Sequence, residues 1–273
     1  MSSVIRSCFV PRQGRVFLQA DYSALELFTL AQVCIDLVGE SALAASLNTG
    51  KDPHLAMGAN ILGITYEEAV SRKKEPEIKD ARQLSKAANF GLPGGLGVEK
   101  FILFAKNTYG VSLTVDAAKR LKAQWFETWP EMRKYFSYIN TLGDHMVHVR
   151  SNRGRGGARY TAMCNSFFQG LGADVAKHSL WLVSKACYTE RESVLFGCRP
   201  VLFVHDEIIV EAPEDDRMHL AVEELSRLMV VGAKHWLPDL QPRTEHCIMR
   251  FWSKDAEPTY DSSGKMVPWP QAS

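Results

Sequence analysis

The sequence lacks the features that define several large classes of protein. Its six cysteines are scattered and form no C-x-x-C pair, so we expect reduced thiols in a cytoplasm. No uncharged apolar run reaches the roughly 18 to 20 residues that span a bilayer. The first residues, Met-Ser-Ser-Val-Ile-Arg, do not have the pattern of a signal sequence, and we find no internal repeat or low-complexity segment. These absences favour a globular protein without a membrane partner.

A strong charge of one sign is also missing. The chain has 32 Lys and Arg against 31 Asp and Glu, a formal net charge of +1. Any surface that binds nucleic acid must therefore come from local basic clusters, such as residues 72–74 or the arginines of residues 150–159. With 273 residues, 46% of them hydrophobic, the chain is long enough to bury one large core or two modest ones.

What the sequence does contain is organised around residues 201–210. Two short apolar runs rich in β-branched residues flank the triplet His205-Asp206-Glu207, which predicts a hairpin with a charged tip in a functional site. The adjacent carboxylates repel each other, and a bound cation would relieve that repulsion. An ordinary solvated turn that carries two acids explains the triplet alone equally well.

A further acid, Asp21, lies at a junction between a strand and a helix. Residues 15–20 form an apolar strand pattern, and the spacing becomes helical from Leu25. Ser23 and Glu26 have the S-x-x-E spacing of a capping box, so a helix cap is the alternative to a functional role for Glu26.

Residues 81–91 predict a helix with an unusual face. Arg82, Lys86 and Phe90 are four residues apart, so two cations and a ring form a row about 12 Å long at 1.5 Å per residue. That length matches a triphosphate with its sugar and base beyond it. The alternative is a surface helix with two solvated cations and a core Phe. His54, in the first turn of another predicted helix, is near exposed amides that favour anions.

The middle of the chain offers candidates for contact with a polynucleotide. Arg153, Arg155 and Arg159 lie between glycines in a predicted hairpin over residues 147–160, which suits phosphate-backbone contact. Asn165 and Gln169 are four apart on the long helix that follows. Their amides could bond to base edges or sugars, or equally to buried backbone groups.

Three of these stretches together resemble motifs of the family A, DNA polymerase I-like, DNA polymerases. Residues 21–27 resemble motif A, D-Y-S-Q-I-E-L; residues 82–91 resemble motif B, R-x-x-x-K-x-x-N-F-G; and residues 204–207 resemble motif C, V-H-D-E. Their order and spacing agree with the family, and the resemblance covers nearly the whole chain. The stretch of residues 89–97 is most similar to bacteriophage members.

The resemblance implies an α+β fold. It implies a polymerase palm, an antiparallel sheet with helices, made from residues 1–30 and 151–273, with an inserted helical fingers subdomain at residues 31–150 and with thumb and exonuclease domains absent. Asp21 and the Asp206 tip should then lie on neighbouring antiparallel strands. The implied function is template-directed DNA synthesis, in which a nucleotide passes from a dNTP to a primer 3′-OH with the help of two Mg²⁺ ions.

The family's functional residues map onto this chain residue by residue. Asp21, Asp206 and the backbone carbonyl of Tyr22 would hold the ions, and Glu207 would add an auxiliary charge. Arg82, Lys86 and His54 would bind the triphosphate, and Lys86 could also protonate the leaving pyrophosphate. Phe90 would pack on the incoming sugar and base, and Glu26 would exclude a ribose hydroxyl. The implied DNA contacts are Asn165, Gln169, His205, Arg153, Arg155 and Arg159.

The chain also departs from the family pattern. Phe28 stands where motif A is normally followed by Arg, and Gly94 stands where motif B normally has the Tyr that partners the sugar-selecting Glu. The missing thumb predicts a second polypeptide that carries a thumb, and a 3′–5′ exonuclease with it, docked near residues 2–9. For a phage-encoded enzyme the expected location is the cytoplasm of a bacterial host.

Two alternatives to a DNA polymerase remain. A non-catalytic nucleic-acid-binding remnant would not need the intact carboxylates together with Arg82 and Lys86. A related single-subunit RNA polymerase would not need Glu26 below the sugar.

Overall fold

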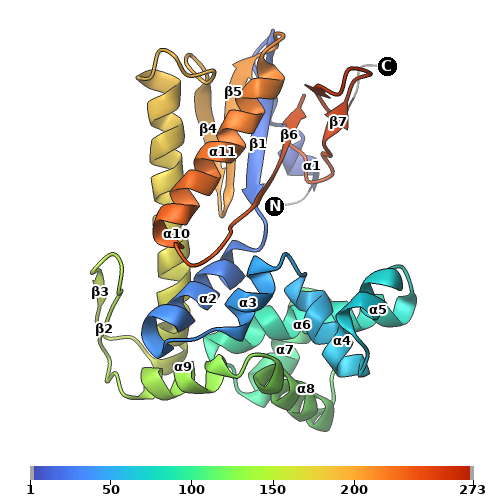
Figure 1. Cartoon of the computed structure of the whole chain (residues 1–273), viewed down its shortest axis with the longest axis vertical. Coiled ribbons are helices and arrows are strands. Elements are labelled where there is room, and N and C mark those ends of the chain that lie inside the picture. Colours follow the sequence, from blue (N-terminus) through green and yellow to red (C-terminus); the bar gives the residue numbers. More distant parts are fainter. Residues whose placement is uncertain (1–2, 271–273) are drawn as a thin grey trace. The chain divides into compact units, whose positions relative to one another are not determined.

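The computed structural model describes residues 3–270 and divides the chain into two units. The sheet unit comprises Met1–Leu25, Ala173–Pro238 and Pro242–Ser273, and the helical unit comprises Glu26–Gly172 and Asp239–Gln241. The predicted α+β class is confirmed (Figure 1). Across residues 3–270, no helix has the length and apolar character needed to cross a membrane. The boundaries predicted for palm and fingers stay predictions.

The sheet unit is built on four antiparallel strands in the order β4-β5-β1-β6 (Figure 1). The strands are β1 (Arg15–Tyr22), β4 (Arg199–Val204), β5 (Glu207–Pro213) and β6 (Thr244–Met249). Around them lie α1 (Ser3–Arg6), the second half of α10 (Tyr160–Tyr188), α11 (Met218–Trp236), β7 (Thr259–Tyr260) and β8 (Met266–Val267). β5 continues to Pro213, which pairs with Arg15, and α11 starts at Met218.

One face of this sheet packs against α11, which contacts β1, β5 and β6. The alternate residues of β1 that point this way, Val16, Leu18 and Ala20, are fully buried. Tyr22 ends the row, and its hydroxyl donates to the carbonyl of Met229 on α11 at 2.6 Å. The same hydroxyl lies 2.6 Å from the hydroxyl of Ser179 on α10. Helix and sheet are therefore joined at the residue that follows Asp21.

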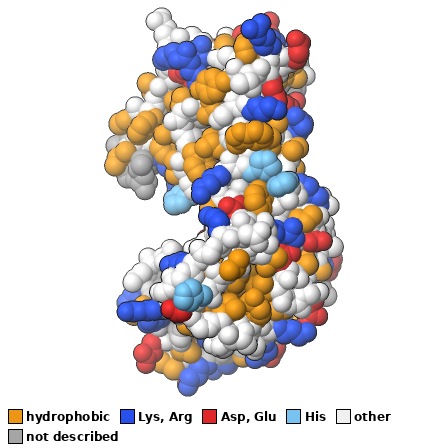
Figure 2. Space-filling view, turned by 90° about the vertical axis from the view of Figure 1, so that its left-hand side faces the viewer, with side chains coloured by type: hydrophobic (Ala, Val, Ile, Leu, Met, Phe, Trp, Pro, Cys, Tyr) orange, Lys and Arg blue, Asp and Glu red, His pale blue; other side chains and the backbone are white. Residues whose placement is uncertain are grey.

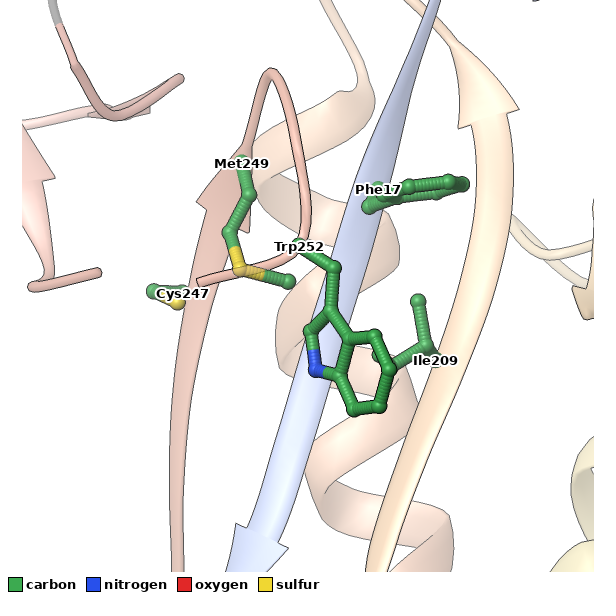
Figure 3. Close-up of a cluster of buried hydrophobic side chains, with 5 residues drawn as sticks. All are labelled: Phe17, Ile209, Cys247, Met249 and Trp252. Carbon is green, nitrogen blue, oxygen red and sulfur yellow. The ribbon is translucent and has the colours of Figure 1, made fainter. Parts of the chain in front are cut away.

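The opposite face carries a second apolar cluster, formed by Phe17, Ile209, Cys247, Met249 and Trp252 (Figure 3). Trp252 comes from the segment after β6, and its indole lies over the strands with almost no exposed surface. Its backbone N–H donates to the carbonyl of Phe9 at 3.0 Å. The face of the sheet that bears Asp21 is thus covered, up to its acidic end, by side chains from both ends of the chain.

The helical unit contains eight helices besides its half of α10, one 3₁₀ turn and one small hairpin in the part of the chain that is described. They are α2 (Leu25–Val38), α3 (Ala42–Asn48), α4 (Pro53–Leu62), α5 (Tyr66–Ser71), α6 (Pro76–Gly91), η1 (Leu92–Gly94), α7 (Val98–Tyr109), α8 (Val115–Thr128), α9 (Glu131–Asn140), β2 (Met146–Val147) and β3 (Gly154–Arg155). Residues 98–109 and 115–128 form the amphipathic helices α7 and α8.

The packing of α4 on α6 places the predicted phosphate-binding face. Gly58 allows the close approach of these helices, because a Cβ atom at this position would lie 3.3 Å from the backbone of Ala81. Asp52 begins α4 as its N-cap, accepting hydrogen bonds from the backbone N–H groups of His54 and Leu55, with Pro53 at the first helical position. Asp52 and Pro53 therefore begin the helix whose first turn contains His54.

Gly232 supplies the first testable prediction. A Cβ atom there would be in hard contact with the Ser179 hydroxyl and 2.9 Å from the Ser179 Cα atom, so α10 and α11 would have to separate. We expect Gly232→Ala to lower the free energy of unfolding by about 1 to 3 kcal/mol. Gly143, where an added Cβ meets nothing within 4 Å, is the matched control and should change it by less than about 0.5 kcal/mol as Gly143→Ala. Urea unfolding measures both, and equal effects would contradict the packing described here.

Candidate active site

The sheet ends in a row of carboxylates on three adjacent strands. Asp21 on β1 is in register with Glu207 on β5 and with Glu245 on β6. Residues in register on neighbouring strands project to the same face, so the three acids lie side by side. On β1 and β6, this face carries the apolar pair Phe17 and Met249 at one end and the acidic pair Asp21 and Glu245 at the other.

The predicted hairpin with a charged tip is confirmed. Val204 pairs with Glu207, which leaves His205 and Asp206 as a two-residue loop between β4 and β5. His205 has a φ of 58°, a conformation that is uncommon for residues other than glycine and is often found at functional sites. The backbone N–H of Tyr22 donates to the carbonyl of Asp206 at 3.4 Å. Asp21 and the Asp206 tip therefore meet on neighbouring antiparallel strands, as predicted.

The position of Asp21 disfavours its charged form. Burial and the negative charges of Asp206, Glu207 and Glu245 raise the pKa of Asp21 to about 7, and a hydrogen bond with Asp206 acts in the same direction. One oxygen of Asp21, Oδ1, is buried without a hydrogen-bond partner among the described residues. A half-buried carboxylate with acidic neighbours is a site that a cation would stabilise.

Glu207 is held by two residues that the sequence did not point to. Its Oε1 accepts the indole N–H of Trp252 at 2.9 Å, and its Oε2 lies 3.5 Å from the guanidinium of Arg6. The Arg6 guanidinium lies 4.2 Å from the centre of the Trp252 ring. Glu207 is buried, so these contacts fix its carboxylate beside Asp21 rather than leaving it to solvent.

An open pocket of about 350 Å³ lies over these acids. Its lining includes Asp21, Asp206, Glu207 and two cations that the sequence did not identify, Arg6 and Lys254. Within residues 3–270, no group of three or more His, Cys, Asp or Glu side chains is arranged to hold a metal ion. Mg²⁺ usually takes only one or two carboxylates and completes its shell with water and substrate phosphates. The residues present therefore fit an ion shared with a substrate, and not a closed protein site.

The predicted row on α6 exists in the helical unit. Arg82, Lys86 and Phe90 are all partly exposed, whereas Ser85 and Asn89 between them are buried. Arg82 Nε donates to Asp52 Oδ2 at 2.7 Å, so the N-cap of α4 also orients this cation. Burial alone would raise the pKa of Asp52, but the hydrogen bond and charge of Arg82 lower it overall.

His54 is buried beside this row and is uncharged near neutral pH. Its pKa is lowered to about 4, chiefly by burial. The charges of Arg82 and Lys86 act in the same direction, and the charge of Asp52 opposes them. Its Nδ1 accepts from the side-chain amide of Asn89 at 3.1 Å, which places the ring proton on Nε2. The His54 and Phe90 rings lie 5.2 Å apart. His54 can therefore offer one neutral N–H donor beside two cations.

Asn89 is the centre of this arrangement, and we did not predict its role. Its Oδ1 accepts the indole N–H groups of Trp125 at 3.1 Å and of Trp129 at 3.0 Å. Because the oxygen is fixed by two donors, the amide nitrogen must face His54 and the carbonyl of Pro53. The two Trp residues, expected as core aromatics, are buried as predicted.

The Asn and Gln of the long helix make contacts within the helical unit. Gln169 Nε2 donates to Glu26 Oε1 at 3.2 Å. Asn165 donates to the backbone carbonyl of Thr161 at 2.8 Å, which is one of the two roles that the sequence left open. Asn165 also lies over Gly94, where an added Cβ would be 2.7 Å from its Nδ2.

Ser23, the other member of the expected capping box, donates its hydroxyl to Glu245 at 3.5 Å.

The basic hairpin is formed by β2 and β3, and its arginines are exposed. Arg153 donates to the carbonyl of Gly170 at 2.8 Å, and Arg155 donates to the hydroxyl of Ser166. Arg150, by contrast, forms a two-pronged ion pair with Asp36, with both distances 2.6 Å. On the face shown in Figure 2, basic side chains are interspersed with acidic and apolar ones, in keeping with the near-zero net charge.

Comparison with known proteins identifies the family. A family model described as DNA polymerase family A matches residues 1–238. The chain belongs to DNA polymerase family A. DNA polymerase I of Aquifex aeolicus is 27% identical over 256 residues, which cover 92% of this chain and 42% of the relative. DNA polymerase I of Lactococcus lactis subsp. cremoris is 30% identical over 227 residues, which cover 78% of this chain and 23% of the relative. The chain thus spans less than half of the length of these relatives.

A solved structure shows the same fold. The POL domain of Pol1 from M. smegmatis, in complex with DNA primer-template and dNTP, is 23% identical with a TM-score of 0.70. The match covers 91% of this chain and 42% of that chain. The resemblance drawn from the three motifs is therefore confirmed at the level of family and fold.

The raised pKa of Asp21 leads to a prediction about stability. An unfolded Asp titrates near 3.9, so between about pH 4 and pH 7 the folded state binds more protons than the unfolded state. This group therefore lowers the free energy of unfolding as the pH rises through that window. Asp21→Asn removes the effect, and after allowance for solvent screening we expect its stability relative to wild type to be about 1 to 2 kcal/mol greater at pH 8 than at pH 5.

Urea unfolding in a chelating buffer without divalent cations measures this difference. Asp216→Asn is the matched control, since Asp216 is exposed, and it should show no comparable pH dependence. An Asp21→Asn variant whose stability relative to wild type is the same at both pH values would show that Asp21 ionises like an ordinary surface acid.

Proposed function

We propose that this chain catalyses template-directed DNA synthesis, the transfer of a nucleotide from a dNTP to a primer 3′-OH. The observation that carries the proposal is the pair Asp21 and Asp206, held together at the acidic end of the sheet in a chain of the DNA polymerase family. The row of Arg82, Lys86 and Phe90 supports a dNTP as the substrate. The named relatives, DNA polymerases I, support DNA as the template and product.

Asp21, Asp206 and the backbone carbonyl of Tyr22 are the proposed ligands of two Mg²⁺ ions. When bound, these ions would neutralise phosphate charge and favour the attacking and leaving oxygens of an in-line displacement. The buried Oδ1 of Asp21 has no hydrogen-bond partner among residues 3–270, and it is a hard oxygen ligand of the kind that Mg²⁺ prefers. Glu207 would add negative charge to the site from the position fixed by Arg6 and Trp252.

The helical unit would bind the triphosphate. Arg82, oriented by Asp52, and Lys86, one turn further along α6, supply two positive charges. His54 adds a neutral N–H donor, fixed by Asn89. Lys86 would also pass a proton to the leaving pyrophosphate, and Phe90 would pack on the incoming sugar and base. Because His54 is uncharged, its bond to phosphate should not depend on pH between about 5 and 8.

The proposed DNA contacts are divided between backbone and bases. The exposed Arg153, Arg155 and Arg159 are proposed to bind phosphates, a sequence-independent and salt-sensitive interaction. Asn165, Gln169 and His205 are proposed to lie at the primer–template. The second polypeptide, the cytoplasmic location and the bacteriophage source stay predictions.

Primer extension tests the proposal. Asp21→Ala and Asp206→Ala should each lower the extension rate by about 10³-fold or more, because each removes a proposed metal ligand. Circular dichroism should show that both variants remain folded, and the exposed Asp216→Ala should extend like wild type. Extension by either site variant at near wild-type rate would remove the metal-ligand assignment, and a wild-type chain that binds primer–template without extending it would favour the non-catalytic alternative.

A second prediction concerns the sugar. Glu26 accepts a hydrogen bond from Gln169 and is proposed to stand below the sugar. We expect Glu26→Ala to lower dNTP incorporation and to increase the relative use of rNTPs by roughly tenfold, and Gln169→Ala to do so by roughly fivefold, the value of one hydrogen bond. Single-nucleotide incorporation with matched dNTP and rNTP pairs measures both ratios. If both variants keep the wild-type ratio, Glu26 has only a structural role at the start of α2.

A further inference from the structure

The sugar-selecting Glu of this chain lacks the partner that the family normally gives it. Gly94 stands at the motif B position that normally has Tyr. In the present arrangement the Asn165 side chain occupies that space, because even a Cβ atom at Gly94 would lie 2.7 Å from Asn165 Nδ2. The role of that Tyr must therefore be filled by another residue or not at all.

Tyr109 is an aromatic residue that the fold places beside Phe90. It is the last residue of α7, and its ring is parallel to that of Phe90, with an interplanar angle of 5° and 6.4 Å between ring centroids. The ring of Phe104 meets it edge-on at 5.7 Å. Phe90 thus has two ring neighbours, His54 at 5.2 Å and Tyr109.

The backbone around Tyr109 fixes its position. Gly110 ends α7 in the left-handed conformation, with its N–H bonded to α7 carbonyls. The carbonyl of Tyr109 accepts from the side chain of Gln83 on α6 at 3.2 Å. The residue is therefore tied to α6, the helix that carries Phe90.

The Tyr109 hydroxyl also lies within the electrostatic reach of Glu26. Burial raises the pKa of Tyr109, and the negative charge of Glu26 raises it further. The phenol therefore stays protonated at neutral pH and can donate a hydrogen bond to a carboxylate. Glu26 already accepts one hydrogen bond from Gln169, and a carboxylate can accept several.

We propose that Tyr109 is a positioning residue for nucleotide binding and sugar selection, with its ring aligning Phe90 and its hydroxyl donating to Glu26 when a dNTP is bound. This inference rests on the proposed function. It assigns to Tyr109, at the end of α7, the role that the Tyr of motif B has elsewhere in the family. It also separates two contributions, since the ring acts through Phe90 and the hydroxyl acts through Glu26.

Two substitutions test the contributions one at a time. Tyr109→Phe keeps the ring and removes the hydroxyl, so the preference for dNTP over rNTP should fall roughly fivefold while the KM for the dNTP stays within about twofold of wild type. Tyr109→Ala removes both, so the same loss of preference should come with a roughly tenfold higher KM. Tyr188→Phe and Tyr188→Ala, at the exposed end of α10, are the matched controls and should match wild type in both quantities.

Equilibrium binding of dATP, measured by calorimetry on the folded chain, separates this inference from the proposed function. Tyr109→Ala should weaken dATP binding roughly tenfold and Tyr188→Ala should not, whether or not the chain extends a primer. Absence of extension by the wild-type chain would overturn the proposed function alone. Unchanged dATP affinity in Tyr109→Ala, or an unchanged sugar preference in an active Tyr109→Phe, would overturn the assignment of Tyr109.

Discussion

Electrostatic repulsion among carboxylates at one end of the sheet is the constraint on which the sheet unit depends. The antiparallel register of β1, β5 and β6 places Asp21, Glu207 and Glu245 in one row, and the β4–β5 hairpin adds Asp206. Such a row is unfavourable in a half-buried place unless something balances it. Protein groups balance only part of it, through Arg6 and Trp252 at Glu207. We propose that the negative charge that remains unbalanced binds cations.

The rest of the sheet unit supports this unfavourable row. The hydrophobic cluster around Trp252 and the packing of α11 on the other face stabilise the strands that carry the acids (Figure 3). Trp252 contributes in two ways, since its ring belongs to the cluster and its N–H donates to Glu207. Burial of apolar area is non-directional, whereas the hydrogen bond fixes one carboxylate in place.

In the helical unit, polar groups are organised around Asn89 instead. One amide connects Trp125, Trp129, Pro53 and His54, so a single buried side chain sets both the helix packing and the tautomer of the His. The cations on α6 then face outward, with only Arg82 paired to a carboxylate by a short hydrogen bond. This arrangement suits an anionic ligand, because positive charge is presented on a rigid helix and not on a loop.

Local sequence patterns predicted the elements and the motif residues. Apolar patterns predicted β1 and the β4–β5 hairpin, and the four-residue spacing of Arg82, Lys86 and Phe90 predicted the C-terminal part of α6, since each pattern is local in the sequence. The placement of Asp21 beside Asp206 was also predicted, because motifs of one family fix it. The roles of Glu245 and Trp252 were not, since each depends on pairing between segments far apart in the chain, which leaves no local signal.

The same limit explains why other contacts in the site were not predicted from the sequence. Gln169 binds Glu26 across 143 positions, and Arg6 lies beside Glu207 across 201. Neither spacing has a period that a sequence pattern can reveal. Asn89 belongs to motif B, but its role depends on hydrogen bonds from Trp125 and Trp129. The sequence predicts that these Trp residues are buried, and it does not show which polar group they bond to. A polar residue on the buried face of an amphipathic helix was the one signal that could have identified it.

Anomalous diffraction from crystals of the chain with primer–template, a dNTP and Mn²⁺ would test the central claim most directly. The account predicts anomalous peaks within ligand distance, about 2 to 2.3 Å, of carboxylate oxygens of both Asp21 and Asp206. It also predicts that Glu207 keeps its bonds to Arg6 and Trp252 in that complex. Crystals that show bound dNTP with no Mn²⁺ beside either aspartate would contradict the account.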